Sequence, residues 1–456
     1  MTLNRRHFLA GAAGASGALL GACAAPGTST PPPASAPPPR PFFIGHPGQA
    51  LMPRGSAPRV VVAGGGWGGM TLAKHLRLLS PATEVVLLEK NPVFFSCPLS
   101  NKWLVDLVEE SLLVHDHLRV ADRHGYQFVQ CEVTEVNRGA RRVHTSAGWL
   151  DYDYLVLAPG IRYDYEAWFG NDRRAAVATR QRFPAAYVPN AEQHHLKRSL
   201  AAFKGGDWVM TLPPPPQRCP PSPYERACMV AWHFKTHGIK GRVTILDHKP
   251  GVAPIGPGFR AAFEQLYKDQ ITYVPNAQVL EVDPFNRRVR TKAGDMRFDH
   301  AVLMAPHQAG DLAWKADAIG RTPEGKPTGW ADVDPLQLHL KTDDRVYVIG
   351  DAVGQVAPTF RFYPKSAHVA NAHGHIVAGY LAERIGSRKP AVKLPDNLCY
   401  MMVNGSPREA ISVQFDYTVN AQGLIEQVQI DDNDRRAELA AENLRWAALK
   451  FEDMLS

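Results

Sequence analysis

The chain has 456 residues, of which 45% are hydrophobic and 21% are charged. These values exclude a fully disordered, collagen-like or multi-span membrane protein. At roughly 150 residues per domain, the length predicts about three domains. The formal net charge is +7, but no run of Lys and Arg resembles a nucleic-acid-binding tract, so we expect no nucleic-acid partner. Six cysteines are too few for a disulfide framework, and no Cys-x-x-Cys pair predicts a metal site.

Residues 1–25 have the pattern of an export signal. Arg5 and Arg6 stand before a short apolar run, as in a Tat signal, with an ordinary Sec signal as the alternative. Cys23 follows that run as in a bacterial lipobox and would carry a lipid, unless the ordinary signal peptidase removes it. Residues 26–58 are rich in Pro, Ala, Ser and Gly, which predicts a semi-rigid linker. We therefore expect a Tat-exported, periplasmic protein whose membrane contact is limited to the lipid on Cys23.

The first folded unit predicted is a strand, a helix and a second strand. Residues 59–63 form a short, β-branched, apolar run that is typical of a buried strand. Residues 70–79 have the apolar spacing of a helix, and residues 84–88 have the pattern of a second buried strand. This order predicts a βαβ unit with parallel strands.

A glycine fingerprint lies in the turn of this unit. Gly64, Gly66 and Gly69 fit G-x-G-x-x-G, in which the glycines permit the turn, admit a pyrophosphate and allow close helix packing, respectively. The helix N-terminus offers N–H groups and a positive dipole end to the phosphates. Glu89 ends the second strand, where a carboxylate would bind a ribose hydroxyl. The pattern predicts a dinucleotide site, with a glycine turn without a ligand as the alternative.

Later segments repeat the same order of elements, which indicates a second α/β unit followed by a smaller α+β tail. Further strands are predicted over residues 129–136, 142–145, 154–157, 208–212, 243–246, 279–282, 288–291, 301–304 and 346–349. Further helices are predicted over residues 224–237, 258–270, 366–384 and 437–455. The repetition is typical of an internally duplicated nucleotide-binding fold.

Two later motifs favour FAD over NAD at the first site. Gly350 and Asp351 end a late predicted strand, at the position where a carboxylate of two-domain flavoproteins holds the ribityl chain of FAD. The predicted strand over 154–157 leads into Gly160 through an Ala-Pro pair, which fits the middle flavin motif. Three motifs in this order predict FAD as the cofactor.

The second unit lacks the fingerprint that a nicotinamide cofactor needs. Its first strand is followed by residues 213–221, which include six prolines. Proline has no N–H to donate and cannot form the glycine turn. We therefore expect that the protein takes no electrons from NAD(P)H at this position and uses another donor.

Five cysteines follow the signal, and their context leaves two interpretations open. Cys131 and Cys228 fall within strand and helix patterns, where a cysteine is usually a buried thiol. Cys97 and Cys219 lie in loops, and Cys399 lies at the start of the tail. All five would be core thiols in one interpretation, whereas disulfide pairing in an exported protein is the other.

The chain resembles the flavin subunits of flavocytochrome c sulfide dehydrogenases. These are relatives of sulfide:quinone oxidoreductases among the disulfide-reductase flavoproteins. The most diagnostic stretch is residues 218–227, and the resemblance extends from about residue 59 to residue 456. The other matching segments are residues 60–69, 96–101, 155–160, 348–352, 364–366 and 399–400. The segment over 351–364 looks longer than in such relatives, and the lipobox and linker are not general to the family.

The resemblance implies a site and a reaction. Cys97 corresponds to a cysteine that binds FAD covalently, and Lys365 lies in a matching segment at the cofactor. Cys219 and Cys399 correspond to a redox-active disulfide beside the flavin, and Glu225 to a carboxylate that is a candidate proton carrier. The implied substrate is hydrosulfide, which attacks that disulfide. Because the chain has no Cys-x-x-Cys-His motif, the implied acceptor is a separate c-type cytochrome subunit or a soluble cytochrome c.

We therefore expect an α/β fold with two Rossmann-like dinucleotide-binding domains of the disulfide-reductase flavoprotein type and a small α+β C-terminal domain. Residues 59–165 and 311–390 would form the FAD-binding domain. Residues 166–310 would form the second Rossmann-like domain without an NAD fingerprint, and residues 391–456 the C-terminal domain.

Three other functions stay open. The nearest is a sulfide:quinone oxidoreductase, because a lipid tether would keep the protein close to a membrane. Against it, the predicted last helix mixes charged and apolar residues like a packed surface helix, whereas those enzymes insert an apolar segment into lipid. The second is a non-catalytic flavin-bearing partner in sulfur oxidation. The third is an NADH-dependent disulfide reductase, which the missing second fingerprint disfavours.

Overall fold

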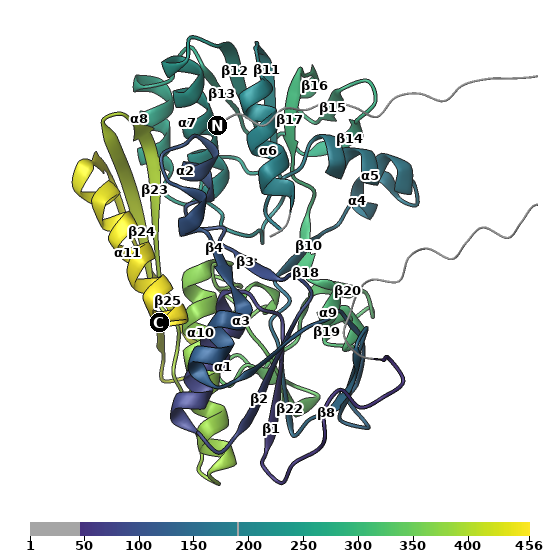
Figure 1. Cartoon of the computed structure of the whole chain (residues 1–456). Helices are drawn as coiled ribbons and strands as arrows, with labels where there is room; N and C mark the ends of the chain where they lie inside the picture. Colours follow the sequence, from purple (N-terminus) through teal and green to yellow (C-terminus); the bar gives the residue numbers. More distant parts are fainter. Residues whose placement is uncertain (1–45, 189–190) are drawn as a thin grey trace, which may run out of the picture. The chain divides into compact units, whose positions relative to one another are not determined.

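The computed structural model describes residues 46–188 and 191–456 (Figure 1). The predicted export signal over 1–25, the lipid on Cys23 and the first part of the predicted linker lie outside the described residues. Within the described residues, two parallel sheets with helices are followed by an antiparallel sheet and a C-terminal helix. This arrangement confirms the predicted α/β class with two Rossmann-like units.

The first parallel sheet is built around β1 (Arg59–Ala63), which is buried at every residue, as expected for an apolar strand covered on both faces. The strand order is β21-β22-β9-β1-β2-β5, with β21 antiparallel to β22. The other strands are β2 (Glu84–Glu89), β5 (Gln127–Gln130), β9 (Tyr154–Leu157), β21 (His339–Leu340) and β22 (Asp343–Val348). Because β1, β9 and β22 are parallel, the residues that follow them meet at one edge of the sheet.

Two long helices lie side by side on this sheet (Figure 1), α1 (Trp67–Leu79) and α10 (Ala367–Ile385). Gly374 allows their backbones to approach closely, because a Cβ there would lie 2.7 Å from the carbonyl oxygen of Gly68. Ser366 caps α10 with its hydroxyl, which accepts a hydrogen bond from the N–H of Val369 at 3.1 Å. The start of α10 is therefore well defined, and with it the position of Lys365 just before the cap.

The second parallel sheet has the order β13-β12-β11-β17 and repeats the design of the first. Its strands are β11 (Gly205–Leu212), β12 (Lys240–Asp247), β13 (Ile271–Val274) and β17 (His300–Leu303), and its helices are α7 (Ser222–Thr236) and α8 (Gly256–Gln265). Each unit also carries an antiparallel three-stranded meander. The meanders are β6 (Val133–Asn137), β7 (Arg142–Thr145) and β8 (Gly148–Asp151), and β14 (Val279–Asp283), β15 (Arg288–Thr291) and β16 (Gly294–Arg297).

The C-terminal layer is an antiparallel sheet with one helix, β23 (Asn397–Gly405), β24 (Arg408–Val419), β25 (Ile425–Arg436) and α11 (Ala437–Leu455). Strand β23 contacts α7 of the second unit and α10 of the first, and α11 packs on β24 and α1. Figure 1 shows these yellow-green strands and the yellow helix extending from α8 down to the upper end of α10. The layer therefore brings Cys399, on β23, to the junction of the two sheets.

The remaining elements connect these layers. The short strands are β3 (Val93–Phe95), β4 (Val114–Asp116), β10 (Ile161–Tyr163), β18 (His307–Ala309), β19 (Ile319–Arg321) and β20 (Pro327–Ala331). The helices are α2 (Ser100–Leu104), α3 (His117–His124), α4 (Glu166–Phe169), α5 (Arg173–Arg182), α6 (Ala191–Ala202) and α9 (Asp311–Lys315), with 3-10 turns η1 (Glu110–Leu112) and η2 (Gly350–Ala352). Among all helices in residues 46–188 and 191–456, none combines the length and the hydropathy that crossing a membrane requires.

The structure corrects the strand predicted over residues 129–136. It is two strands, because β5 belongs to the parallel sheet and β6 to the meander. Between them the buried Cys131 donates its N–H to the carbonyl oxygen of Glu89 at 3.0 Å, and the chain turns away from the sheet. The sequence pattern conceals such a turn, because β-branched residues occur on both sides of it, at Val129 and at Val133, Thr134 and Val136.

The helix predicted over residues 258–270 ends at Gln265. Two residues later, Tyr267 is buried and its hydroxyl donates to the carbonyl oxygen of Val403 at 2.8 Å. The backbone carbonyl of Tyr267 accepts the N–H of Ile271, where β13 begins. A contact with β23, far away in the sequence, therefore ends this helix earlier than its periodicity indicates.

Candidate active site

Three glycines build the turn between β1 and α1, and their surroundings fit the fingerprint. Gly64 has φ +115°, and a Cβ there would collide with the carbonyl oxygen of Ala158. A Cβ on Gly69 would collide with the carbonyl oxygen of Gly64, so this glycine allows the helix to pack on the turn. At Gly66 no described protein atom lies within 4 Å of the Cβ position. The space before the N-terminus of α1 is therefore open to a ligand.

Glu89 ends β2 beside this turn, as predicted. Its carboxylate accepts hydrogen bonds from the N–H of Gly65 at 2.8 Å and from the backbone and side-chain N–H groups of Asn91 at 2.9 and 2.6 Å. These bonds fix the carboxylate in the wall of a cavity of about 550 Å³, which the glycine turn also lines. This volume lies in the ordinary range of small-molecule sites.

A second cavity of about 150 Å³ adjoins the first. Gly66, Gly160 and Arg218 line both, so an extended ligand can pass from one cavity into the other along the N-terminus of α1. Gly160 has φ +63°, and a Cβ there would lie 2.6 Å from a guanidinium nitrogen of Arg218. Glycine at this position therefore makes room for the arginine at the junction, and the two cavities together fit the predicted dinucleotide.

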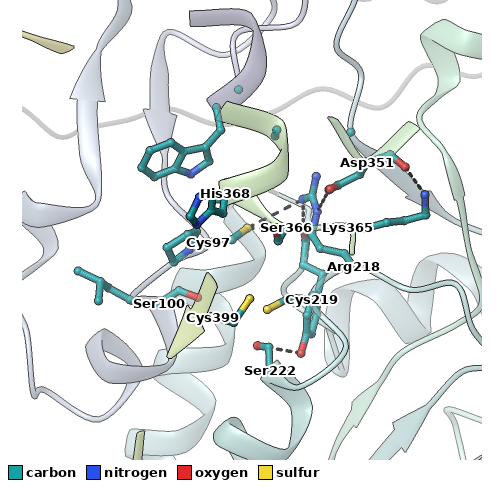
Figure 2. A pocket seen from close by; sticks show the side chains of 18 of the residues that line it. Cys97, Ser100, Arg218, Cys219, Ser222, Asp351, Lys365, Ser366, His368 and Cys399 are labelled. Atoms are coloured by element: carbon teal, nitrogen blue, oxygen red, sulfur yellow. Dashed lines mark hydrogen bonds and ion pairs between the residues drawn. The ribbon is translucent and has the colours of Figure 1, made fainter. Parts of the chain in front are cut away.

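Asp351 follows β22 and faces this junction (Figure 2). Its Oδ2 pairs with Nε of Arg218 at 2.5 Å, but its Oδ1 is buried without a hydrogen-bond partner among the described residues. A buried carboxylate oxygen without a donor is costly, and a ligand hydroxyl supplies such a donor. Gly350, with φ +70°, turns the chain so that Asp351 takes this position. The pair therefore fits the predicted contact with a ribityl hydroxyl.

Lys365 is buried behind the same pair. Its Nζ donates to the carbonyl oxygens of Asp351 and Val353, both at 2.8 Å, and lies 3.9 Å from the ring centroid of Trp330. Burial lowers the pKa of Lys365 to about 7, and the Asp351 carboxylate opposes that shift. Lys365 therefore fixes the turn that carries Asp351, and its amine titrates near neutral pH.

Cys97 follows β3 and precedes α2 in the sequence, and its side chain lines the second cavity (Figure 2). Its sulfur lies 3.9 Å from Nη1 of Arg218 and 3.7 Å from the carbonyl oxygen of Tyr187. Burial raises the pKa of the Cys97 thiol, and the Arg218 charge opposes this shift. The thiol lies in the same cavity as Asp351, as a cysteine that binds a flavin must, and the covalent bond stays a prediction.

Cys219 lies on the proline-rich loop over residues 213–221, between β11 and α7. Its φ of +47° is in the left-handed region, which is uncommon for a residue with a side chain and is frequent at functional sites. Its N–H donates to the carbonyl oxygen of Lys365 at 2.7 Å. The loop therefore takes the place of a second glycine turn and is fixed against the segment before α10.

Cys399 approaches Cys219 from β23, and Figure 2 shows the two sulfurs pointing toward one another. Burial, and then the charge of Cys399, raise the pKa of the Cys219 thiol well above its usual value. Burial also raises the pKa of Cys399 to about 11. Both are free thiols in this structure, so the disulfide between them stays a prediction. Cys131 and Cys228 are buried and free, as expected of core thiols.

Glu225 lines the same cavity, but its carboxylate is held by partners that the sequence did not indicate. Oε1 pairs with Nζ of Lys102 at 2.5 Å and accepts the N–H of Met402 at 2.8 Å, and Oε2 accepts from Nδ2 of Asn101 at 2.7 Å. Glu225 on α7 thus joins α2 and β23. The segment over 96–101, which matches the family, ends one residue before Lys102. Its position was the one signal in the sequence that pointed to this part of the chain.

Two further residues of the cavity wall were missed, His368 and Trp446. The indole Nε1 of Trp446 on α11 donates to Nδ1 of His368 on α10 at 3.3 Å. Both line the second cavity with Cys399. Sequence periodicity marks Trp446 only as part of an amphipathic helix, so its place in the cavity is a result of tertiary packing.

Comparison with known proteins agrees with this geometry. The family model "Sulfide dehydrogenase [flavocytochrome c] flavoprotein chain, central" matches residues 193–305, and the model "Pyridine nucleotide-disulphide oxidoreductase" matches residues 58–170. The mitochondrial sulfide:quinone oxidoreductase of Mus musculus is 25% identical over 371 residues, which cover 79% of this chain and 78% of that protein. The flavocytochrome c sulfide dehydrogenase flavoprotein chain of Chlorobaculum thiosulfatiphilum is 54% identical over 43 residues, which cover 9% of this chain and 90% of that sequence.

A solved structure shows the same fold. The X-ray structure of the sulfide:quinone oxidoreductase from Aquifex aeolicus matches with a TM-score of 0.68 and 18% sequence identity. The match covers 87% of this chain and 91% of that chain. At this identity the likeness concerns the fold alone.

Gly66→Ala is expected to weaken FAD binding and to leave the flavin-free fold unchanged. Gly66 has φ −83° and open space around its Cβ position, so the fold accepts a methyl group there. The same methyl group would occupy the space that a pyrophosphate needs. The FAD dissociation constant, measured by fluorescence titration in a Cys97→Ser background, should rise by about tenfold or more. Gly379→Ala on α10, which also has open space, is the matched control. We call the glycine turn over residues 64–69 the cradle. Equal FAD affinity in both variants would show that the cradle does not bind FAD.

Alkylation of Cys399 in the reduced, flavin-free chain is expected to follow a pKa near 11 instead of the ordinary 9.0. The thiolate is the reactive form, and burial disfavours it. At pH 8 the two-unit shift corresponds to a rate roughly 100-fold below that of an unperturbed thiol. Iodoacetamide labelling between pH 7 and 11, read by peptide mass spectrometry, measures the profile, with the denatured chain as control. A midpoint at or below 9 would contradict the proposed burial.

Proposed function

Because the chain belongs to the family of flavocytochrome c sulfide dehydrogenase flavoprotein chains, within the pyridine nucleotide-disulphide oxidoreductases, we propose that it is an FAD-dependent enzyme that oxidises hydrosulfide. The observation that carries this proposal is the convergence of Cys97, Cys219 and Cys399 on one cavity that continues into a dinucleotide cradle. The cradle accounts for the cofactor, and the cysteines account for the substrate.

The proposed reaction starts at a disulfide between Cys219 and Cys399. Hydrosulfide attacks one of the two sulfurs, so that a bond forms between the substrate and that cysteine while the bond between the cysteines breaks. The products of this step are a cysteine persulfide and the thiolate of the other cysteine. The substrate sulfur has then lost two electrons, which the cysteine pair has gained. The facing sulfurs of the two thiols support this step.

Charged side chains in the cavity wall suit an anionic substrate. Arg218, Arg226, Lys102 and Lys365 line the cavity, and they outnumber the carboxylates of Asp351 and Glu225. A site with excess positive charge raises the local concentration of hydrosulfide. Burial raises the pKa of both reactive thiols, so a proton carrier is needed when a thiolate forms. Glu225, whose charge acts on both thiols, is the proposed carrier.

FAD bound in the cradle supplies an acceptor for two electrons, which it can release singly. We propose that Gly64, Gly66 and Gly69 position its pyrophosphate, and that Glu89 and Asp351 bind its ribose and ribityl hydroxyls. The sulfur of Cys97 is the proposed point of covalent attachment. Arg218 and Lys365 orient Asp351 from two sides.

The proposed electron acceptor is a c-type cytochrome on a separate chain, and the proposed location is the periplasm after Tat export. Quinone is the second candidate acceptor, because the mouse relative that spans most of the chain is a sulfide:quinone oxidoreductase. On α11, Leu449 is 58% exposed, whereas Leu444 and Trp446 pack against the core. The helix α11 therefore offers little apolar surface to lipid, which favours the cytochrome.

Hydrosulfide is expected to reduce the flavin of the anaerobic, flavin-loaded chain, whereas NADH is not. The reason is the proline-rich loop that replaces a second glycine turn. Loss of the flavin absorbance band in stopped-flow mixing measures the reaction. Adding oxidised cytochrome c to one sample and a short-chain quinone to another then separates the two acceptors. Rapid reduction by NADH, or no reduction by sulfide, would contradict the proposal.

Cys219→Ser and Cys399→Ser are each expected to lower sulfide-driven flavin reduction by at least about 100-fold while flavin content stays normal. The hydroxyl of serine cannot form the disulfide that hydrosulfide attacks. Cys228→Ala is the matched control, because Cys228 is a buried thiol on α7 outside the cavity. A flavin-bearing protein without catalysis would show no sulfide-driven flavin reduction in any of the four chains. Full activity in either serine variant would contradict the disulfide mechanism.

The flavin is expected to stay with the protein after acid precipitation, and Cys97→Ser is expected to release it. The Cys97 sulfur lines the cavity beside Arg218 and is therefore open to a cofactor bound there. Absorbance of the pellet and supernatant measures the bound fraction. Cys131→Ser, which changes a buried cysteine in the wall of the neighbouring cavity, is the control. Flavin entirely in the supernatant of the unsubstituted protein would disprove attachment.

A further inference from the structure

Three helices from distant parts of the chain bring two imidazoles and a carboxylate together, outside the cavity described above. His75 lies on α1, His375 on α10 and Asp453 on α11. One donor atom from each lies within 4.8 Å of the other two. The imidazole ring centroids are 3.9 Å apart with an interplanar angle of 47°. All three side chains are partly exposed, although Nε2 of His75 itself is buried.

The two histidines contact Asp453 at different distances. Nε2 of His375 lies 2.8 Å from Oδ2 of Asp453 and makes a good hydrogen bond. Nε2 of His75 lies 3.3 Å from Oδ1 of Asp453, which is ion-pair distance but a weaker contact than that of His375. Two Nε2 atoms and one carboxylate oxygen that face one another form a set of donors for a metal ion.

The surroundings hold the carboxylate in place, as outer partners do at metal sites. Nδ2 of Asn371 donates to Oδ2 of Asp453 at 2.8 Å and to Oγ1 of Thr71 at 3.0 Å. Oδ1 of Asn371 accepts from Nζ of Lys450 at 3.0 Å, which fixes the orientation of the amide. Nζ of Lys74 donates to the backbone carbonyl oxygen of Asp453 at 2.6 Å. Asp453 is thus anchored through both its backbone and its side chain.

We propose that His75, His375 and Asp453 bind a divalent metal ion of the zinc type. Two imidazole nitrogens and one carboxylate oxygen suit Zn²⁺, which also accepts a water as fourth ligand. Donor atoms around a tetrahedral zinc ion are about 3.3 Å apart, so small side-chain rotations bring these three donors into place. The site is independent of the proposed sulfide oxidation.

Metal binding at this cluster would fasten α11 to α1 and α10. The same helix α11 carries Asn443 and Trp446, which line the cavity that contains Cys399. An ion that ties Asp453 to the two histidines therefore stabilises the helix that forms this wall. Such a link has the effect of a cross-link between α11 and the two helices of the first unit.

Zinc binding is tested on the untagged, flavin-loaded full chain, with Cys219→Ser and Cys399→Ser in the background to remove competing thiol ligands. After treatment with EDTA, Zn²⁺ is titrated against a chromophoric chelator in sulfide-free buffer, and Co²⁺ absorption reports the coordination. We expect one metal ion per chain. His75→Gln, His375→Gln and Asp453→Asn should each weaken binding by at least about tenfold, and Asn371→Ala by about 10-fold or more. His237→Gln, which removes an imidazole that stacks on His233, should change nothing.

Thermal unfolding gives a second readout, because a metal that binds the folded chain raises its midpoint. Zn²⁺ should raise the midpoint in the background chain and in His237→Gln, but not in the cluster variants. Should a cluster variant fail to fold, Zn²⁺ should still protect His75 and His375 of the unsubstituted cluster from diethyl pyrocarbonate, as read by peptide mass spectrometry. Zinc affinity that is the same with and without the cluster, or no protection of these histidines, would overturn the proposal.

Discussion

The hydrogen bond from the N–H of Cys219 to the carbonyl oxygen of Lys365, with the adjoining ion pair of Arg218 and Asp351, makes one site from two folding units. The cradle belongs to the first sheet, whereas Cys219 belongs to a loop of the second. Removing one partner of a buried ion pair costs about 3–5 kcal/mol, so this contact holds the loop firmly. The left-handed backbone of Cys219 persists because these neighbouring bonds determine it.

The C-terminal layer is joined to the same site by polar contacts of the same kind. Glu225 on α7 meets Lys102 on α2 and the backbone of Met402 on β23, so its carboxylate fixes the strand that carries Cys399. On the other side of that layer, α11 reaches α1 and α10 through Asp453. Apolar packing alone is tolerant of small shifts, whereas buried charges need defined partners. Hydrogen bonds and ion pairs therefore fix the position of the C-terminal layer relative to the two sheets.

Much of the fold could be predicted because its evidence is local. The apolar strand over 59–63, the glycine turn and the following helix lie within one short segment, and the structure has them where the periodicity indicates. The strand over 129–136 could not be predicted correctly, because a hydrogen bond from Cys131 to Glu89 divides it. The helix over 258–270 likewise ends early through a contact with another layer. Periodicity reports which face of an element is buried, but not what it is buried against.

The sequence by itself determined the cradle, since the roles of Gly64, Gly66 and Gly69 depend on backbone conformations within a single turn. It also determined that a proline-rich loop follows the first strand of the second unit, where a glycine turn would stand in a dinucleotide site. Only the tertiary structure decided that Lys102 would pair with Glu225, and that His75 would meet His375 and Asp453 across three helices. Those partners lie far apart in the sequence and share no motif. Their meeting depends on how closely whole helices and sheets pack, which no local pattern encodes.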